Sequence, residues 1–432
     1  MNLYPRQLRP WSFALTAVAC AAAAAGSVSW IPASAASDPG PPGWVASWGA
    51  SPSPATPPSL AGPDDHSAAG FNGQTVRDIV FSSAGGSAAR VTISNTFGSS
   101  PLSVGEADLA VAGQGAAVRP GTGHRLTFGG SGSVTVPPGA QVRSDPARMA
   151  VPALTDLAVS IYLPGKTGPA TYHSDAQQTN YISGTGNFAG QESGAAFSTT
   201  SGSWYYADAV DVTASPPLRG TVVAFGDSIT DGYQSTPSAN LRWPNDLARR
   251  LLSSPGPGLG VPDEGISGNR ILHDSACFGV NALSRFRRDA LSQSGVRDVI
   301  LLEGINDIGF SQTPDTGCTV PNTAVSADQI IAGDRQLIRD AHARGVKIFG
   351  GTLTPFKGAA YWSAAAEAKR DAVNNWLRTS HAFDGVIDFA SAVASSSDPQ
   401  VMNPGYDSGD HLHPNDAGYQ AMANAINLSQ LR

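Results

Sequence analysis

Apolar and polar residues alternate with a period of two along the first half of the chain, from about Trp44 to Val212. Runs such as Arg90–Ser94 and Leu157–Tyr162 place every second side chain on one face, which is typical of half-buried β-strands. Clusters of Gly, Pro, Ser and Asn separate these runs, as turns do between strands. The pattern predicts an all-β sandwich or jelly-roll-like domain over residues 44–214.

The pattern changes after Ser215-Pro216-Pro217, where short apolar runs begin to alternate with segments of helical period. The runs carry no alternation, as expected for strands covered on both faces. They are Val222–Phe225, a weaker run ahead of Gly265, Val299–Leu302, Val346–Phe349 and Val386–Phe389. Residues 219–432 are therefore predicted to form a three-layer α/β/α domain with its ligand crevice at the carboxyl ends of the strands.

Helical segments are expected between and after these runs, because apolar residues recur there three or four positions apart. Their stripes are Trp243, Leu247 and Leu251, then Ile330, Asp334, Leu337 and Ala341, then Trp376 and Leu377 at the end of a third helix, and last a helix of about Asp416–Asn427. Gly345 stands where a C-terminal cap belongs, and Asn415 is expected to cap the last helix at its N-terminus.

The first 35 residues have the three-part layout of a signal peptide. Arg6 and Arg9 precede an apolar, alanine-rich run, and Ala33-Ser34-Ala35 offers small residues for cleavage. The alternative is a membrane anchor, but the run from about Trp11 to Ala25 is shorter than the roughly 20 residues that a span needs and lacks a basic flank. The sequence predicts an exported protein without a membrane span.

The net charge and the cysteines limit which partners the protein can bind and indicate whether its cysteines are oxidised. With 27 Lys and Arg against 34 Asp and Glu, the formal net charge is −7, so no basic surface for nucleic acid or an anionic membrane is expected. Cys20 would leave with the signal peptide, which leaves Cys277 and Cys318 in an oxidising compartment. A disulfide between them is predicted ahead of a metal pair, and it would join two loops at the crevice.

A candidate nucleophile stands directly after the first strand of the α/β domain, at Ser228 in Gly226-Asp227-Ser228-Ile229-Thr230. A hydroxyl is a poor nucleophile until a base removes its proton, so the serine alone indicates little. Near the end of the chain, Asp410 lies three residues before His413. At this spacing the carboxylate can fix the tautomer of the imidazole and stabilise its protonated form. Ser228, His413 and Asp410 are therefore candidate catalytic residues.

The same segment could instead hold a metal ion, because two histidines and a carboxylate are common zinc ligands. In the sequence, Asp410, His411 and His413 have no second cluster of His or Cys to accompany them. Neither a metal nor another cofactor is therefore expected, and His411 is interpreted as a solvated neighbour of His413.

An acyl-transfer enzyme also needs fixed donors for the oxyanion that forms on the attacked carbonyl. Gly268 has no Cβ to keep its N–H away from a substrate, and Asn306 carries a side-chain amide just after the strand Val299–Leu302. Ser228 would add its own N–H. A turn would also explain Gly268, and a helix cap would also explain Asn306. Each residue is therefore weak evidence when taken singly.

The order of these blocks resembles the SGNH (GDSL) hydrolase family. The blocks Gly-Asp-Ser, Gly-x-x-Gly-Asn, Gly-x-Asn-Asp and Asp-x-x-His-Pro contain Ser228, Gly268, Asn306 and His413 and span most of residues 219–432. The resemblance implies a flavodoxin-like fold and an acyl-enzyme mechanism without metal. It also implies an oxyanion hole made of the Ser228 and Gly268 N–H groups and the Asn306 side chain.

The first half of the chain also resembles a domain found in this family. Trp44-Val45-Ala46-Ser47-Trp48 and Ser94-Asn95-Thr96-Phe97-Gly98 resemble the β-domain of one branch. That branch contains secreted actinobacterial acylhydrolases and the arylesterase-like enzymes found with xylan degradation.

Together these residues predict a secreted hydrolase of carboxylic esters that works through an acyl-serine intermediate. No long apolar lid segment is evident near the blocks, so short acyl groups on carbohydrate or aryl alcohols are favoured over the lipid substrates of a lipase or phospholipase. The expected partner is a small-molecule or polysaccharide ester. A protein of another class stays open, in which the β-domain binds carbohydrate and the α/β domain is only a scaffold.

Overall fold

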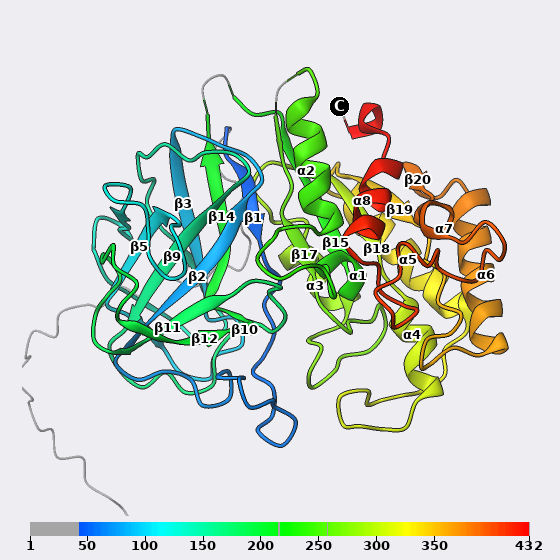
Figure 1. The fold of residues 1–432 in the computed structure, drawn as a ribbon, viewed down its shortest axis with the longest axis horizontal. Coiled ribbons are helices and arrows are strands. Elements are labelled where there is room, and N and C mark those ends of the chain that lie inside the picture. Colours follow the sequence, from blue (N-terminus) through cyan, green and yellow to red (C-terminus); the bar gives the residue numbers. More distant parts are fainter. Residues whose placement is uncertain (1–42, 215–216, 257, 432) are drawn as a thin grey trace, which may run out of the picture. The chain divides into compact units, whose positions relative to one another are not determined.

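The computed structural model describes residues 43–214, 217–256 and 258–431 (Figure 1). The predicted signal peptide, residues 1–35, lies outside the described residues and stays a prediction. In the described part of the chain, every helix is too short or too polar to cross a membrane.

Antiparallel strands make up the first part of the described chain (Figure 1). They are β1 Val45–Gly49, β2 Gln74–Ser82, β3 Ala88–Ser94, β4 Leu102–Val104, β5 Glu106–Val111, β6 His124–Arg125, β7 Val134–Val136, β8 Gln141–Arg143, β9 Thr155–Leu163, β10 Tyr172–His173, β11 Asn180–Thr185, β12 Phe197–Ser201, β13 Trp204–Tyr205 and β14 Ala207–Thr213. One sheet has the order β12-β11-β2-β9-β5-β6 and the other β1-β14-β3-β8, while β4 pairs with β7 and β10 with β13.

The two larger sheets share one apolar core. Alternate residues of β9 enter it, among them Leu157, Val159 and Ile161, and all three are fully buried. From the other sheet, β3 contributes Ile93 and β14 contributes Val210. Burying a side chain of this size stabilises a fold by about 1.5–3 kcal/mol, so the alternation seen in the sequence determines which face of each strand packs inward. The predicted β-sandwich is confirmed.

A parallel sheet forms the centre of the second part. Its strands are β15 Gly220–Gly226, β16 Leu259–Gly260, β17 Asp263–Gly265, β18 Val296–Leu302, β19 Lys347–Gly351 and β20 Gly385–Ile387. β16 and β17 pair with one edge of β15, and the other edge continues through β18 and β19 to β20. This is the flavodoxin-like strand order that the resemblance implied. In such sheets ligands bind where the order reverses, at the carboxyl ends of the neighbouring strands β15 and β18.

Helices cover this sheet. They are α1 Ser228–Asp231, α2 Trp243–Ser253, α3 Ala282–Asp289, α4 Ile305–Gly309, α5 Ala327–His342, α6 Ala364–Thr379, α7 Phe389–Val393 and α8 Asp416–Ala425, with 3-10 turns at Phe310–Gln312 and Leu428–Leu431. One group consists of α2, α7 and α8, and a second of α3, α4, α5 and α6. The predicted stripes of α2 and α5 are buried as expected, which confirms the α/β/α class.

One predicted element end is wrong and another is confirmed. The strand expected over Val386–Phe389 ends at Ile387, because Asp388 accepts a hydrogen bond from the Ser391 N–H and caps a helix that begins at Phe389. Gly345 caps the C-terminus of α5 as predicted: it has φ +68°, its N–H donates to the His342 carbonyl at 2.9 Å, and the Val346 N–H donates to the Ala341 carbonyl at 3.1 Å.

Strand β1 connects the sandwich to the parallel sheet. The Ala46 N–H donates to Thr221 Oγ1 of β15 at 3.0 Å, and the Ser51 hydroxyl donates to the Glu264 carboxylate of β17 at 2.8 Å. The described residues belong to one compact unit. The division into domains of residues 44–214 and 219–432 therefore stays a prediction from the change of sheet type.

Candidate active site

Ser228 lies at a sharp turn from β15 into α1. A Cβ on Gly226 would come within 2.2 Å of the Leu302 carbonyl oxygen, so only glycine fits where the two strands end together. The Asp227 carboxylate then accepts the Ile229 N–H at 3.0 Å and caps α1. Ser228 is consequently the first residue of the helix, where a backbone N–H has no acceptor within the helix.

A chain of hydrogen bonds runs from Ser228 to Asp410. Ser228 Oγ lies 2.8 Å from Nε2 of His413, and Nδ1 of His413 lies 2.6 Å from Asp410 Oδ2. Because a carboxylate only accepts, Nδ1 carries a proton, and in the neutral imidazole Nε2 is left with a lone pair facing the serine hydroxyl. The structure thus brings together three residues that the sequence predicted, in the order that a serine nucleophile requires.

The electrostatics of Asp410 favour its charged form. Its Oδ1 accepts the N–H groups of Leu412 at 2.9 Å and His413 at 2.8 Å. Burial raises the pKa of Asp410, but the hydrogen bonds and the charge of His413 outweigh burial and hold the pKa well below its usual range. Asp410 is therefore a carboxylate at every pH at which an esterase is assayed, and it can stabilise an imidazolium at His413.

The loop that carries His413 is fixed at both ends. Asn415 caps α8 by accepting the Gly418 N–H at 3.0 Å, as predicted, and its amide donates to the Asp407 carbonyl at 3.1 Å. The Tyr233 ring packs edge-on against His413 with the ring centroids 4.7 Å apart. His411 does not share this environment, because it is half-exposed and its Nδ1 lies 2.6 Å from the Asp407 carboxylate.

The two remaining predicted donors lie at the ends of β17 and β18. Gly268 has φ +78°, and a Cβ there would come within 2.4 Å of the Phe278 ring, so glycine is required. Its N–H has no acceptor among the described residues. The buried amide of Asn306 donates from Nδ2 to the Asn269 carbonyl at 2.9 Å, and its Oδ1 lies 3.4 Å from the Tyr361 hydroxyl. One Nδ2 hydrogen of Asn306 is left for a further acceptor.

Cys277 and Cys318 form a disulfide, with Cα atoms 5.1 Å apart. Cys277 precedes Phe278, whose ring packs against Gly268 and whose carbonyl accepts from Asn269 at 2.7 Å. Cys318 follows α4, which begins next to Asn306. The bond therefore joins the segments that follow the two proposed oxyanion donors.

Metal ligation was the alternative for the Asp410 segment. In residues 43–214, 217–256 and 258–431, no group of three or more His, Cys, Asp or Glu side chains is arranged to hold a metal ion. The expectation of no metal and no cofactor stays a prediction.

Sequence reasoning missed Arg285, which is fully buried on α3. Its guanidinium donates to the Asn269 side chain at 2.8 Å and to the carbonyls of Gly226 at 2.7 Å and Glu264 at 2.8 Å. It therefore ties the strand ends of β15 and β17 to the residue after Gly268. The available signal was weak, because helix α3 is short and half of its residues are charged.

A comparison with known families decides the class of this domain. Residues 224–421 match the model of the GDSL-like Lipase/Acylhydrolase family. The α/β part is a GDSL-like lipase/acylhydrolase domain. The protein is accordingly an enzyme, a carboxylic ester hydrolase, as the blocks around Ser228 and His413 predicted.

Solved structures similar to the GDSL-like domain have low identity. A GDSL-like lipase from Bacteroides thetaiotaomicron is 21% identical, covers 49% of this chain and 88% of its own, and has a TM-score of 0.36. A catalytic mutant of an acetylxylan esterase from Geobacillus stearothermophilus is 20% identical, covers 50% of this chain and 94% of its own, and has a TM-score of 0.39. No curated protein matches the chain. The assignment therefore rests on the family match.

Proposed function

We propose that this enzyme is a secreted serine esterase that removes short acyl groups from carbohydrates or aryl alcohols through an acyl-Ser228 intermediate. The observation that carries the proposal is the hydrogen-bonded chain in which Ser228 Oγ lies 2.8 Å from His413 and His413 lies 2.6 Å from Asp410. It is the arrangement that makes a serine hydroxyl nucleophilic in water.

In the acylation step, Ser228 Oγ attacks the ester carbonyl carbon while Nε2 of His413 accepts the hydroxyl proton. The imidazolium that forms is stabilised by the Asp410 carboxylate. The tetrahedral intermediate then expels the alcohol, which takes the proton from His413 as it leaves.

During this step negative charge develops on the carbonyl oxygen. The Ser228 N–H, the Gly268 N–H and the spare Nδ2 hydrogen of Asn306 are the proposed donors to it. Ser228 and Asn306 lie in the short helices α1 and α4, and Gly268 lies in a turn, so the surrounding fold orients all three donors before the substrate arrives.

Deacylation uses the same groups in reverse. A water molecule attacks the acyl-Ser228 carbonyl and gives its proton to His413, and the Ser228 oxygen leaves with that proton. The carboxylic acid is released and the enzyme returns to its starting state. No redox reagent enters the cycle.

Two features support a short and polar substrate. Among the described residues, the exposed large hydrophobic side chains are Tyr233, Leu252 and Val320, which is too little apolar surface to hold a lipid aggregate. A hollow of about 350 Å³ is lined mainly by polar residues such as Asp175 and Gln177. Neither Ser228 nor His413 lines it, but Asp175 lies 3.0 Å from the hydroxyl of Ser267, the residue before Gly268. Hydroxyl-rich alcohols such as sugars bind through polar groups of this kind.

The test is a chain-length series of nitrophenyl esters, assayed beside acetylated xylan and a phospholipid. We expect kcat/KM to be highest for acetyl or propionyl esters and acetate to be released from the xylan, with no activity in a Ser228→Ala control. A maximum at long acyl chains, or hydrolysis of the phospholipid alone, would make the enzyme a lipase.

Secretion has its own test. We expect the protein recovered from the medium of a secreting host to begin next to Ala35. An intact N-terminus on protein found only inside the cells would contradict export.

A further inference from the structure

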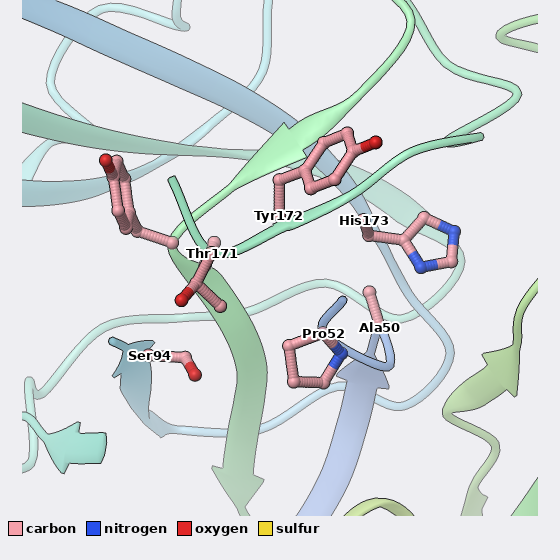
Figure 2. Close-up of a pocket in the computed structure, with 8 residues that line it drawn as sticks. Ala50, Pro52, Ser94, Thr171, Tyr172 and His173 are labelled. Atoms are coloured by element: carbon pink, nitrogen blue, oxygen red, sulfur yellow. The ribbon is translucent and has the colours of Figure 1, made fainter. Parts of the chain in front are cut away.

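His173 of β10 is a fully buried histidine that lies in the sandwich but contacts the GDSL-like domain. Its Nε2 lies 3.0 Å from Asp231 Oδ1 at the end of α1, and its Nδ1 lies 3.0 Å from the Ser51 carbonyl oxygen. Figure 2 shows its ring directed away from Thr171, at the far end of the short strand. The side chains of His173 and Asp231 are each only 4% exposed.

The partners of the ring define its charge. A carbonyl oxygen and a carboxylate oxygen both accept hydrogen bonds, so both ring nitrogens of His173 must donate. A histidine that donates from both nitrogens is a cation, and Asp231 is the anion that faces it. Burial lowers the pKa of His173, but the charge and hydrogen bond of Asp231 outweigh burial and raise the pKa. The result is a water-excluded ion pair between the two parts of the molecule.

Asp231 also joins two segments of the active site. Its Oδ2 accepts the Ser267 N–H at 2.9 Å and the Ser267 hydroxyl at 2.7 Å. Asp231 ends the four-residue helix that Ser228 begins, and Ser267 precedes Gly268. One carboxylate therefore links helix α1, which begins with Ser228, to the turn that contains Ser267 and Gly268. This second segment is called the glycine turn below.

The segment that leads into the glycine turn packs directly against α1. A Cβ on Gly265 would come within 2.3 Å of the Asp231 backbone nitrogen, so the two backbones are in direct contact. A second sandwich residue, Asp175, has its Oδ2 3.0 Å from the Ser267 hydroxyl, whose single hydrogen is shared between Asp231 and Asp175. The sandwich thus contacts this turn directly through Asp175 and indirectly, by way of Asp231, through His173.

We infer that His173 is a positioning residue of the esterase: through Asp231 and Ser267 it sets the placement of the Gly268 N–H relative to Ser228. The β-sandwich is then an integral part of the active site and not a separate binding module. The inference rests on the proposed roles of Ser228 and Gly268. A displacement of about 1 Å in such a site lowers turnover by roughly a hundredfold, so the effect of losing His173 is measurable.

The main test compares His173→Gln with wild type, using nitrophenyl acetate. Glutamine has no positive charge, and its single amide cannot reproduce the geometry of the two ring nitrogens. We expect kcat to fall roughly tenfold to a hundredfold with KM nearly unchanged, because the lost placement affects a donor that acts on the transition state. The control is His342→Gln, since His342 is an exposed histidine 2.8 Å from Asp384. Its kcat should stay at the wild-type value.

Two further variants separate positioning from folding. In Asp231→Asn a neutral amide can donate to neutral His173 and still accept from Ser267, so we expect a smaller fall in kcat than in His173→Gln. Ser267→Ala removes only a half-buried hydroxyl, and we expect a threefold to tenfold fall in kcat at unchanged KM. This variant keeps the inference testable should His173→Gln not fold.

Wild-type kcat in both His173→Gln and Ser267→Ala would overturn the inference, as would losses confined to KM. A loss in Asp231→Asn as large as that in His173→Gln would also overturn it, because the neutral pair keeps a hydrogen bond between the same two side chains, with its direction reversed. Failure of the proposed function gives a different result. Ser228→Ala would then keep its activity, regardless of the effect of His173→Gln.

Discussion

Replacing Asn306 by alanine tests the oxyanion assignment most sharply among the donor variants. The amide of Asn306 has two Nδ2 hydrogens, and the Asn269 carbonyl at 2.9 Å occupies one of them. Alanine removes the second hydrogen, which is the proposed donor to the oxyanion, together with the support that the amide gives to the glycine turn. The variant should therefore lose transition-state stabilisation and some folding stability at once.

The effect of the variant on kcat and its effect on folding stability can be measured separately. Removal of one oxyanion donor costs about 10²–10³ in kcat, or roughly 2.7–4 kcal/mol of barrier. The Asn269 carbonyl loses a buried partner, which lowers the free energy of unfolding by about 1–3 kcal/mol. Tyr361→Phe is the matched control, because the Tyr361 hydroxyl contacts Asn306 Oδ1 at 3.4 Å but is not among the proposed donors to the oxyanion. It should lower kcat less than tenfold.

The assay measures kcat and KM for nitrophenyl acetate well below the midpoint of thermal unfolding of each variant. Asn306→Ala should show the fall in kcat with a modest change in KM, and Asn306→Asp should be no better, since a carboxylate replaces the donor with an acceptor. A change confined to KM would show that Asn306 only binds substrate. Equal losses in Asn306→Ala and Tyr361→Phe would show that the whole effect is structural.

Three further predictions concern the triad, the disulfide and pH. His413→Ala should be about as damaging as Ser228→Ala, and the double variant hardly worse, because the two side chains act as one unit; additive losses in kcat would contradict this. Reduction of the Cys277–Cys318 disulfide should lower activity at temperatures where circular dichroism still shows a folded protein. On the chain-entropy model, closing this loop of 41 residues stabilises the fold by up to about 4 kcal/mol. Loss of activity and of folded structure at the same temperature would argue against a role of the disulfide at the active site. Burial raises the pKa of Asp208 to about 7. Because that is above the value of about 3.9 in an unfolded chain, its contribution to stability is fully present below about pH 4 and is lost as pH rises through about 7. Asp208→Asn should therefore flatten the fall in unfolding free energy between about pH 4 and 7, measured by urea denaturation, and an unchanged slope would refute the attribution.

The sequence predicted those parts of the fold that have strong local signals. The strands β15, β18 and β19 are short apolar runs, and α2 and α5 have regular apolar stripes, so each could be located from its own residues. Pairing of Ser228 with His413 was predictable because nucleophile and base need each other chemically, although 185 positions separate them. Element ends were less predictable, since a single cap at Asp388 was enough to end β20 early.

The parts that escaped prediction depend on packing between distant segments. His173 lies 58 positions from Asp231, and nothing in its own strand distinguishes it from other scattered histidines. Arg285 is a charged residue on a short polar helix, which a pattern-based reading assigns to the surface. Its burial follows only from the carbonyl groups of Gly226 and Glu264, which converge on it after the strands have paired.

The central claim is that catalysis proceeds through an acyl group on Ser228. The most direct measurement quenches the enzyme in acid during hydrolysis of nitrophenyl acetate, digests it and determines by mass spectrometry which peptide carries the acetyl group. We expect the acetyl group on Ser228 and on no other residue, and none in Ser228→Ala, which should fold normally while losing about four or more orders of magnitude in kcat. Acetylation at another residue, or a Ser228→Ala variant that keeps a tenth of the wild-type rate, would contradict the account.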